Sequence, residues 1–217
     1  MKFPIVVLDQ LFTNPDEVRD FALGLEYSSD TPEFPGTRSQ ELDTVAPFLK
    51  EKVIRSLLAQ YSESGLVKLE ARAYFQKITP SDLRGTDGIA HRDENVITFM
   101  GYLTPNVLDC GTSILKPKTD FVVPFNNERK MAFYSGEHDD QFGEYVKEYN
   151  DYHYSEICRV SGLYNTGLAF NGFEPHKANL TPVNPEDNVE RLTLVMFVYN
   201  IHGLSSIDHR EKRGSVI

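Results

Sequence analysis

The stretch Ile89-Ala90-His91-Arg92-Asp93 is the most informative part of this chain. In an extended strand, side chains alternate between the two faces of a sheet, so His91 and Asp93 would point to one side and Arg92 to the other. One imidazole and one carboxylate on a shared face are two candidate metal ligands. The pair alone is weak evidence, because a chain of 217 residues with 32 acidic residues often contains a His-x-Asp in a charged loop.

One distant histidine, His176, completes a set of two histidines and one carboxylate. Such a set binds one side of a metal ion and leaves the opposite positions open for substrate and oxygen, as in the facial triad of non-haem Fe(II) oxygenases. Taken by itself, His176 would be interpreted as a loop histidine. A mononuclear iron site is therefore a hypothesis that depends on the residues around these three.

The composition indicates one soluble, folded domain. Apolar residues form 40% of the chain, with 14 Phe and 11 Tyr, and single β-rich domains of this length are common. No apolar run approaches the about 20 residues that cross a bilayer, and no signal peptide is recognised, so a cytoplasmic location is expected. Cys110 and Cys158 lack metal or redox spacing and are interpreted as reduced thiols. The net charge of −10 opposes binding to nucleic acid.

The pattern along the chain predicts helices first and strands afterwards. We expect a short strand at residues 5–8, helices starting near Pro15 and covering residues 45–61, and a half-buried strand at residues 67–78. Aromatic residues at helical spacing predict an amphipathic helix over residues 139–160, inserted between strands. The remaining strands are predicted at residues 96–103, 112–115, 120–123, 130–134, 167–170 and 191–200.

This order predicts an α+β fold: a double-stranded β-helix, or jelly-roll and cupin-like barrel, with N-terminal helices packed on one sheet and a helical insertion. We expect a single domain over residues 1–217. Its predicted parts are a helical N-terminal support (1–66), a jelly-roll core (67–200) and a C-terminal tail (201–217).

Several short motifs occur in a recognisable order. They are His91-Arg92-Asp93, Phe99-Met100-Gly101-Tyr102-Leu103-Thr104, Cys110-Gly111-Thr112-Ser113-Ile114-Leu115, Gly167-Leu168-Ala169-Phe170, His176 and Arg191-Leu192-Thr193. This order resembles the 2-oxoglutarate/Fe(II)-dependent dioxygenases, in particular their prolyl 4-hydroxylase-like branch. In that family a strand follows the His-x-Asp and a Gly-x-Thr turn leads to the next strand. A Gly-containing strand precedes the distal histidine, and an Arg-x-Ser/Thr lies beyond it. The resemblance covers about residues 67–200.

The resemblance implies that His91, Asp93 and His176 hold Fe(II). Arg191 would bind the distal carboxylate of 2-oxoglutarate, because a guanidinium forms a bidentate pair with a carboxylate, and Thr193 would face the same way.

A further contact to 2-oxoglutarate is expected from Tyr74, Gln76 or Tyr102, and the sequence does not decide between them. Arg38 is a candidate for contact with an acidic or carbonyl group of the substrate, although a lone loop arginine is more often solvated.

The implied reaction uses O2 and 2-oxoglutarate to hydroxylate an unactivated C–H bond of a peptidyl or small-molecule substrate. Asp93 argues against the related halogenases, which leave that position to chloride, and Phe197 stands where the base-repair branch carries a second arginine. Two other classes stay open. One is a catalytically silent binding module on the same fold, and the other is a different metal enzyme with two histidines and one aspartate as ligands, against which Arg191 argues. The substrate and the oligomeric state are not indicated.

Overall fold

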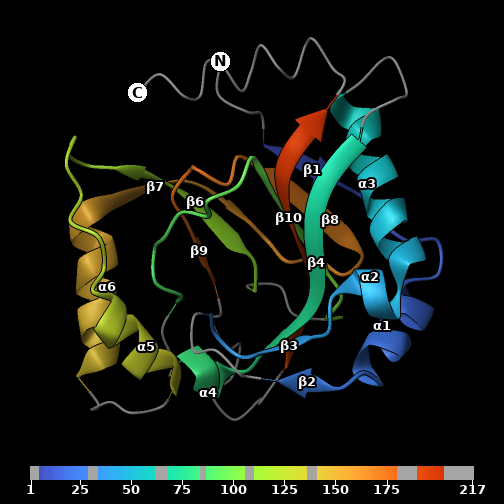
Figure 1. The fold of residues 1–217 in the computed structure, drawn as a ribbon. Helices are drawn as coiled ribbons and strands as arrows, with labels where there is room; N and C mark the ends of the chain where they lie inside the picture. The colour runs from blue at the N-terminus through green and yellow to red at the C-terminus, as the bar shows by residue number, and fades with distance from the viewer. Residues whose placement is uncertain are drawn as a thin grey trace.

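The computed structural model describes residues 5–28, 34–61, 68–83, 87–105, 110–135, 141–179 and 190–202 (Figure 1). The helices are α1 (Pro15–Leu23), α2 (Leu42–Val45), α3 (Pro47–Tyr61), α4 (Pro80–Leu83), α5 (Asn127–Ser135) and α6 (Phe142–His153). The strands are β1 (Val6–Leu8), β2 (Tyr27–Ser28), β3 (Thr37–Ser39), β4 (Lys68–Ile78), β5 (Ile97–Tyr102), β6 (Thr112–Pro117), β7 (Tyr154–Val160), β8 (Thr166–Phe170), β9 (His176–Ala178) and β10 (Arg191–His202). Of the predicted C-terminal tail, residues 203–217 lie outside the described part.

Two antiparallel sheets form the body of the fold. The larger sheet has the strand order β1-β8-β5-β10-β4-β3-β2, and the smaller sheet has the order β7-β6-β9. The long strand β10 pairs with β4 on one side and with β5 on the other. This is the α+β, jelly-roll-like fold that the sequence predicts. None of the described helices has the length and apolar character needed to cross a membrane.

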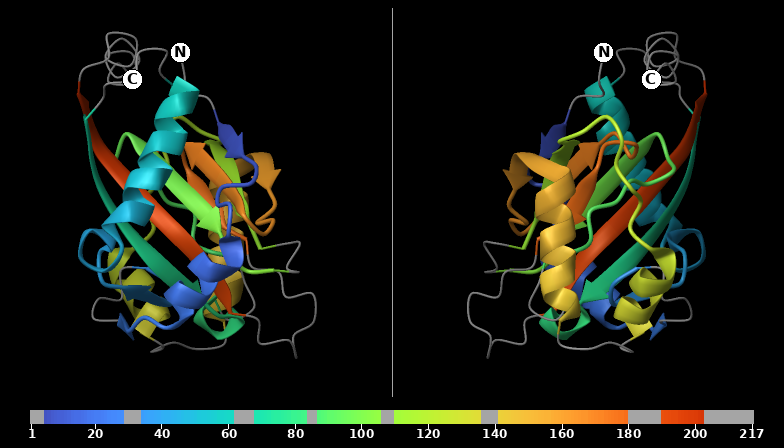
Figure 2. Two further views of the ribbon diagram at one scale, coloured as in Figure 1. Left: turned by 90° about the vertical axis from the view of Figure 1, so that its right-hand side faces the viewer. Right: turned by 90° about the vertical axis from the view of Figure 1, so that its left-hand side faces the viewer.

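Alternation along β10 separates an outer, apolar face of the larger sheet from an inner face. On the outer face, Leu194 shares a buried cluster with Val53 and Leu57 of α3, and Figure 2 shows α1 to α3 lying over this face. Burial of each large apolar side chain stabilises the fold by about 1.5–3 kcal/mol. Because neighbours in a strand point to opposite faces, Arg191 and Thr193 point to the inner side.

Two of the predicted strands are wrong. Residues 130–134 lie in α5, whose start is capped by the side chain of Asn126, which accepts a 3.1 Å hydrogen bond from the Arg129 amide. The four apolar residues that follow Lys130 are too short a run to be assigned to helix or strand by periodicity alone. Residues 120–123 form no strand, because Phe121 and Val123 are exposed and do not pack on a sheet.

The predicted helical insertion is too long. The helix α6 ends at His153, and the following residues form β7, which pairs with β6. The strands β2, β3 and β9 are absent from the sequence prediction, because two or three residues are too few for a periodic pattern. Two of these short strands hold candidate functional residues, since β9 begins with His176 and β3 contains Arg38.

Candidate metal centre

The side chains of His91, Asp93 and His176 converge, and their ligand atoms all lie within 4.8 Å of one another. The Nε2 atom of His176 is 3.3 Å from Asp93 Oδ2, and the Nε2 atom of His91 is 3.7 Å from Asp93 Oδ1. Ligand atoms bound to one ion at about 2.1 Å are about 3 Å apart when they occupy adjacent positions. A small inward movement of these side chains would therefore enclose a metal ion.

The backbone brings the two histidines together. The His91 amide donates to the His176 carbonyl at 3.0 Å, and the His176 amide donates to the His91 carbonyl at 2.9 Å, which forms an antiparallel bridge. Each ring then donates from Nδ1 to a carbonyl two residues earlier, at 2.8 Å to Ile89 and at 3.0 Å to Glu174. Because a carbonyl only accepts, Nδ1 carries the proton in both rings. In a neutral ring with this tautomer, Nε2 is the unprotonated nitrogen, which is the one that binds a metal.

Asp93 is oriented by two hydrogen bonds. Its amide donates to the Gly172 carbonyl at 2.8 Å, and the Thr98 hydroxyl donates to its Oδ2 atom at 2.6 Å. Burial acts to raise the pKa of Asp93, but His176 and His91, which donate to or attract the carboxylate when their rings are protonated, and the Thr98 bond hold this pKa well below its usual range. The carboxylate is therefore ionised at neutral pH and suited to bind a cation.

The surroundings of His91 favour the neutral ring. Burial among protein groups lowers the pKa of His91 to about 4, and the charges of His176 and of Lys130 on α5 act in the same direction. Asp93 and the Ile89 carbonyl oppose this shift. The ring is enclosed by protein but not sealed, since 40% of its side-chain surface remains accessible. His91 is thus neutral at pH 7, as metal binding requires.

Arg191 is a buried cation. The residue is 2% exposed, and its three guanidinium nitrogens have no hydrogen-bond acceptor in the described part of the chain. Burial lowers the pKa of Arg191, whereas Tyr102 and Cys110 act to raise it. The guanidinium carbon is 5.5 Å from the centre of the Tyr102 ring. Because an uncompensated buried charge is strongly destabilising, an anionic ligand would stabilise this arrangement.

Tyr102 and Thr193 share the inner face with Arg191. They lie directly opposite each other on β5 and β10, and opposed residues of an antiparallel pair point to the same face. The Tyr102 hydroxyl donates to Thr112 Oγ1 at 2.9 Å, and its oxygen can still accept a hydrogen bond. Of the candidates for a second cosubstrate contact, Tyr102 is the one next to Arg191.

Tyr74 and Gln76 make other contacts. The Tyr74 hydroxyl donates to Glu41 at 3.0 Å, and the side-chain amide of Gln76 donates to the Pro35 carbonyl at 2.8 Å. Both hydrogen bonds connect β4 to the segment that precedes α3. A role for either residue in cosubstrate binding stays a prediction.

A buried cluster on the inner side connects Arg191 to the histidines. It consists of Tyr102, Ile114, Leu168 and Phe170. Tyr102 contacts Arg191, whereas the Phe170 ring lies 4.7 Å from the His176 ring. The three candidate ligands and the buried guanidinium therefore border the same interior.

Arg38 lies among aromatic side chains at the edge of this interior. Its guanidinium carbon is 3.7 Å from the centre of the Phe34 ring and 5.3 Å from that of Phe197. Phe197 is directly opposite Thr98 on β5, and the Thr98 hydroxyl holds Asp93. Arg38 is therefore on the inner side of the sheet, at the level of the candidate metal ligands.

Three buried polar residues near the site are not singled out by sequence reasoning: Asn95, Thr98 and Asn150. The Thr98 hydroxyl is 3.1 Å from Asn95 Oδ1 as well as bonding Asp93. Asn150 bonds the segment that ends at His91. The sequence does contain one signal for Asn150. This polar residue follows the buried Val146 by one helical turn and so falls on the face of the helix that is expected to be buried.

A family model described as a family of unknown function, DUF6445, matches residues 1–198. The chain belongs to the DUF6445 family. No curated protein sequence is significantly similar to it.

The DUF6445 chain shares its fold with solved structures of 2-oxoglutarate-dependent enzymes. HygX from Streptomyces hygroscopicus, solved with nickel and 2-oxoglutarate, aligns over 90% of this chain and 83% of its own, with 14% identity and a TM-score of 0.54. An oxidoreductase of the 2OG-Fe(II) oxygenase family from Burkholderia pseudomallei aligns over 90% and 84%, with 11% identity and a TM-score of 0.51. The 2-oxoglutarate-dependent carbocyclase SnoK from nogalamycin biosynthesis aligns over 90% and 79%, with 12% identity and a TM-score of 0.50. The predicted resemblance is confirmed at the level of the fold.

Proposed function

We propose that this protein is an Fe(II)- and 2-oxoglutarate-dependent dioxygenase that uses O2 to hydroxylate an unactivated C–H bond. In this proposal His91, Asp93 and His176 hold the metal, and Arg191 holds the distal carboxylate of 2-oxoglutarate. The observation that carries the proposal is Arg191, a buried cation whose guanidinium nitrogens meet no acceptor in the described part of the chain.

The donor set suits Fe(II). Two neutral imidazoles and one carboxylate on one side of an ion leave its other positions open to a cosubstrate and to O2. With 2-oxoglutarate bound, such an ion supplies the oxidative chemistry, in which one oxygen atom of O2 enters succinate as CO2 is lost and the other enters the substrate.

Arg191 favours a cosubstrate that carries a carboxylate. A guanidinium makes two parallel charge-assisted hydrogen bonds to a carboxylate, and the pair neutralises a charge that is otherwise buried alone. The hydroxyl groups of Tyr102 and Thr193 face the same side, and each would donate to the carboxylate by turning its hydrogen away from its present acceptor, Thr112 Oγ1 or the Gln76 carbonyl. A hydrolytic metal enzyme has no evident use for such a guanidinium.

The residues around the metal ligands would fix their orientation. The Ile89 and Glu174 carbonyls hold the two imidazole rings with Nε2 toward Asp93, and Thr98 holds the carboxylate. Loss of one such partner typically lowers metal affinity by about 10- to 100-fold. The apolar cluster around Phe170 would exclude water from the reacting centre.

As substrate we propose a small molecule or a peptidyl group. HygX, which has this fold, is solved with hygromycin B bound. Arg38 would contact an acidic or carbonyl group of the substrate, because its guanidinium lies beside Phe197 on the inner side. The net charge of −10 disfavours nucleic acid.

The test is to add Fe(II) and 2-oxoglutarate without oxygen and to record the weak visible charge-transfer band of the chelate. The wild type and an Arg55→Met control, changed at an exposed arginine of α3, should both give the band. His91→Ala should abolish it. Arg191→Met should raise the concentration of 2-oxoglutarate required by at least about 30-fold, since loss of a buried charge pair costs about 2 kcal/mol or more.

Absence of the band in the wild type would refute the proposed function. A band that survives in His91→Ala would refute the ligand assignment, and unchanged 2-oxoglutarate affinity in Arg191→Met would refute the anchor. Succinate release in air with a substrate library then separates an active enzyme from a silent binding module.

A further inference from the structure

The segment that ends at His91 lies between β9 and α6. On one side its backbone pairs with β9: the Gly88 amide donates to the Ala178 carbonyl at 2.8 Å, and His91 and His176 exchange two bonds. On the other side it faces the helix α6. Backbone groups on that side need partners, because unpaired buried amides and carbonyls are costly.

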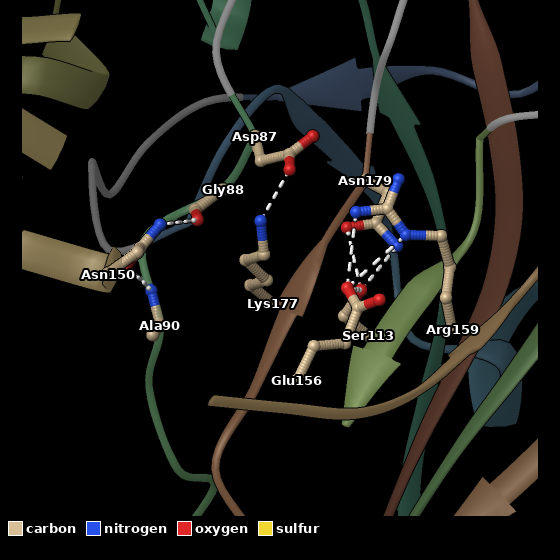
Figure 3. Close-up of polar contacts among 9 residues, drawn as sticks. All are labelled: Asp87, Gly88, Ala90, Ser113, Asn150, Glu156, Arg159, Lys177 and Asn179. Carbon is tan, nitrogen blue, oxygen red and sulfur yellow. Dashed lines mark hydrogen bonds and ion pairs between the residues drawn. The ribbon is translucent and has the colours of Figure 1, made fainter. Parts of the chain in front are cut away.

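Asn150 of α6 supplies these partners, as Figure 3 shows. Its Oδ1 atom accepts a 2.9 Å hydrogen bond from the Ala90 amide, and its Nδ2 atom donates a 3.1 Å hydrogen bond to the Gly88 carbonyl. Asn150 is 6% exposed. Its side-chain amide therefore makes the two backbone hydrogen bonds that a neighbouring strand would otherwise make with this segment.

One of these bonds reaches the metal-ligand candidate through a single peptide group. The Ala90 amide and the Ile89 carbonyl belong to the same planar peptide. Asn150 binds the N–H end of that peptide, and His91 Nδ1 donates to its oxygen end at 2.8 Å. The chain of bonds runs from the Asn150 amide oxygen through one rigid plane to the imidazole ring, and bonds in such a chain strengthen one another.

We propose that Asn150 is a positioning residue of the metal centre: through the Ile89–Ala90 peptide it sets the orientation of the His91 ring and keeps Nε2 directed at the metal. The inference rests on the proposed function for the presence of the metal. It assigns to α6, the helix of the insertion, a role at the site in addition to packing.

The strand β9, which begins with His176, is held by contacts of Lys177 and Asn179 that lie outside the site (Figure 3). Lys177 forms an ion pair with Asp87, which ties β9 to the start of the same segment. Asn179, next to the end of β9, exchanges hydrogen bonds with the buried Ser113 of β6. Because β9 is held in this way, loss of the Asn150 bonds should loosen His91 more than His176.

The matched comparison is Asn150→Ala against Val146→Ala. Val146 is fully buried one turn earlier on α6 and packs in the cluster that contains Ile89. Its truncation loosens the same helix and segment by lost packing and leaves both Asn150 hydrogen bonds in place. A difference between the two variants therefore reports the hydrogen bonds and not helix docking in general.

The measured quantity is the affinity for Co(II) alone. It is determined from the visible d–d absorption of Co(II), under conditions where both variants are fully folded. We expect Asn150→Ala to bind Co(II) about 10- to 100-fold more weakly than the wild type, with an altered band shape. Val146→Ala should bind Co(II) clearly more tightly than Asn150→Ala, because both hydrogen bonds of Asn150 remain in place. Equal affinities in Asn150→Ala and wild type would overturn the inference while leaving the proposed function intact.

A second measurement does not depend on any variant. Hydrogen exchange of the metal-free wild type should show the Ala90 amide protected to a similar degree as the His91 amide, which pairs with β9. Rapid exchange at Ala90 alone would overturn the inference. Failure of the wild type to bind Co(II) would overturn the proposed function and the role of Asn150 with it.

Discussion

Replacement of Arg191 by methionine should stabilise the ligand-free protein and remove its response to 2-oxoglutarate. Methionine retains most of the arginine stem volume but carries no charge. Arg191 is 2% exposed and its guanidinium nitrogens have no acceptor among the described residues, so the wild type carries a desolvation penalty that the variant lacks. Replacement of buried ionic groups by apolar ones is neutral or stabilising by about 1–4 kcal/mol.

The magnitude can be expressed as a melting temperature. A gain of about 2 kcal/mol corresponds to about 4–8 °C for a chain of this length. With Co(II) present and no 2-oxoglutarate, Arg191→Met should therefore melt at or above the wild type. At a 2-oxoglutarate concentration of about 100 times Kd, the wild type gains about 2.7 kcal/mol and the order reverses. Thermal unfolding at matched Co(II) concentration measures both effects.

The control is Arg55→Met, because Arg55 is exposed and pairs with Glu51 on the same helix. That variant should melt close to the wild type and keep the full 2-oxoglutarate response. A clear loss of stability in ligand-free Arg191→Met would show that the protein already compensates the guanidinium. An undiminished 2-oxoglutarate shift would show that the cosubstrate carboxylate binds elsewhere.

Three further outcomes are expected. Thr98→Val removes the 2.6 Å hydrogen bond to Asp93 with little change of shape, so Co(II) affinity measured by titration should fall about 10- to 100-fold, and an unchanged affinity would contradict this role. In the metal-free protein the pKa of His91 is lowered from 6.5 to about 4. Between these two pH values the unfolded state binds more protons than the folded state, so the free energy of unfolding should decrease as the pH falls from 6.5 to about 4. Urea denaturation at pH 7 and pH 5 measures this decrease, which should be smaller in His91→Gln; equal decreases in the two proteins would rule His91 out as its source. At Gly162 an added Cβ would lie 1.6 Å from the Cys110 carbonyl oxygen, whereas at Gly24 the nearest atom would be 3.6 Å away. Gly162→Ala should thus lose at least about 2 kcal/mol in chemical denaturation and Gly24→Ala almost none, and similar losses would contradict the close approach of the two segments.

The layered fold is accessible from sequence because it depends on simple alternation. Leu192, Leu194 and Met196 alternate with Arg191 and Thr193 along β10, and the structure buries the first set against the helices. The spacing in His91-x-Asp93 likewise predicts two side chains on one side, and their ligand atoms lie together with that of His176. Such features need only the period of a strand.

The features that could not be predicted from the sequence depend on contacts between distant segments. Residues 130–134 have a composition that fits either a strand or a helix, and the cap at Asn126 decides for the helix. The three residues of β9 form a strand because β6 lies beside them. Asn150 appears as an ordinary polar residue of a helix until its contacts with Gly88 and Ala90 are known. No periodic pattern encodes a partner that lies 60 positions away.

The bridge between His91 and His176 determines when in the folding reaction a metal ion can bind. The unfolded chain offers His91 and Asp93 as close neighbours, but the third ligand arrives only after β9 has joined the segment before Asp93 and a long loop has closed. Loop closure of this kind belongs to the slow, non-local part of folding. A metal ion at this site would therefore slow unfolding without accelerating refolding. The protein would bind its metal after folding, and the metal would not direct the folding of the chain.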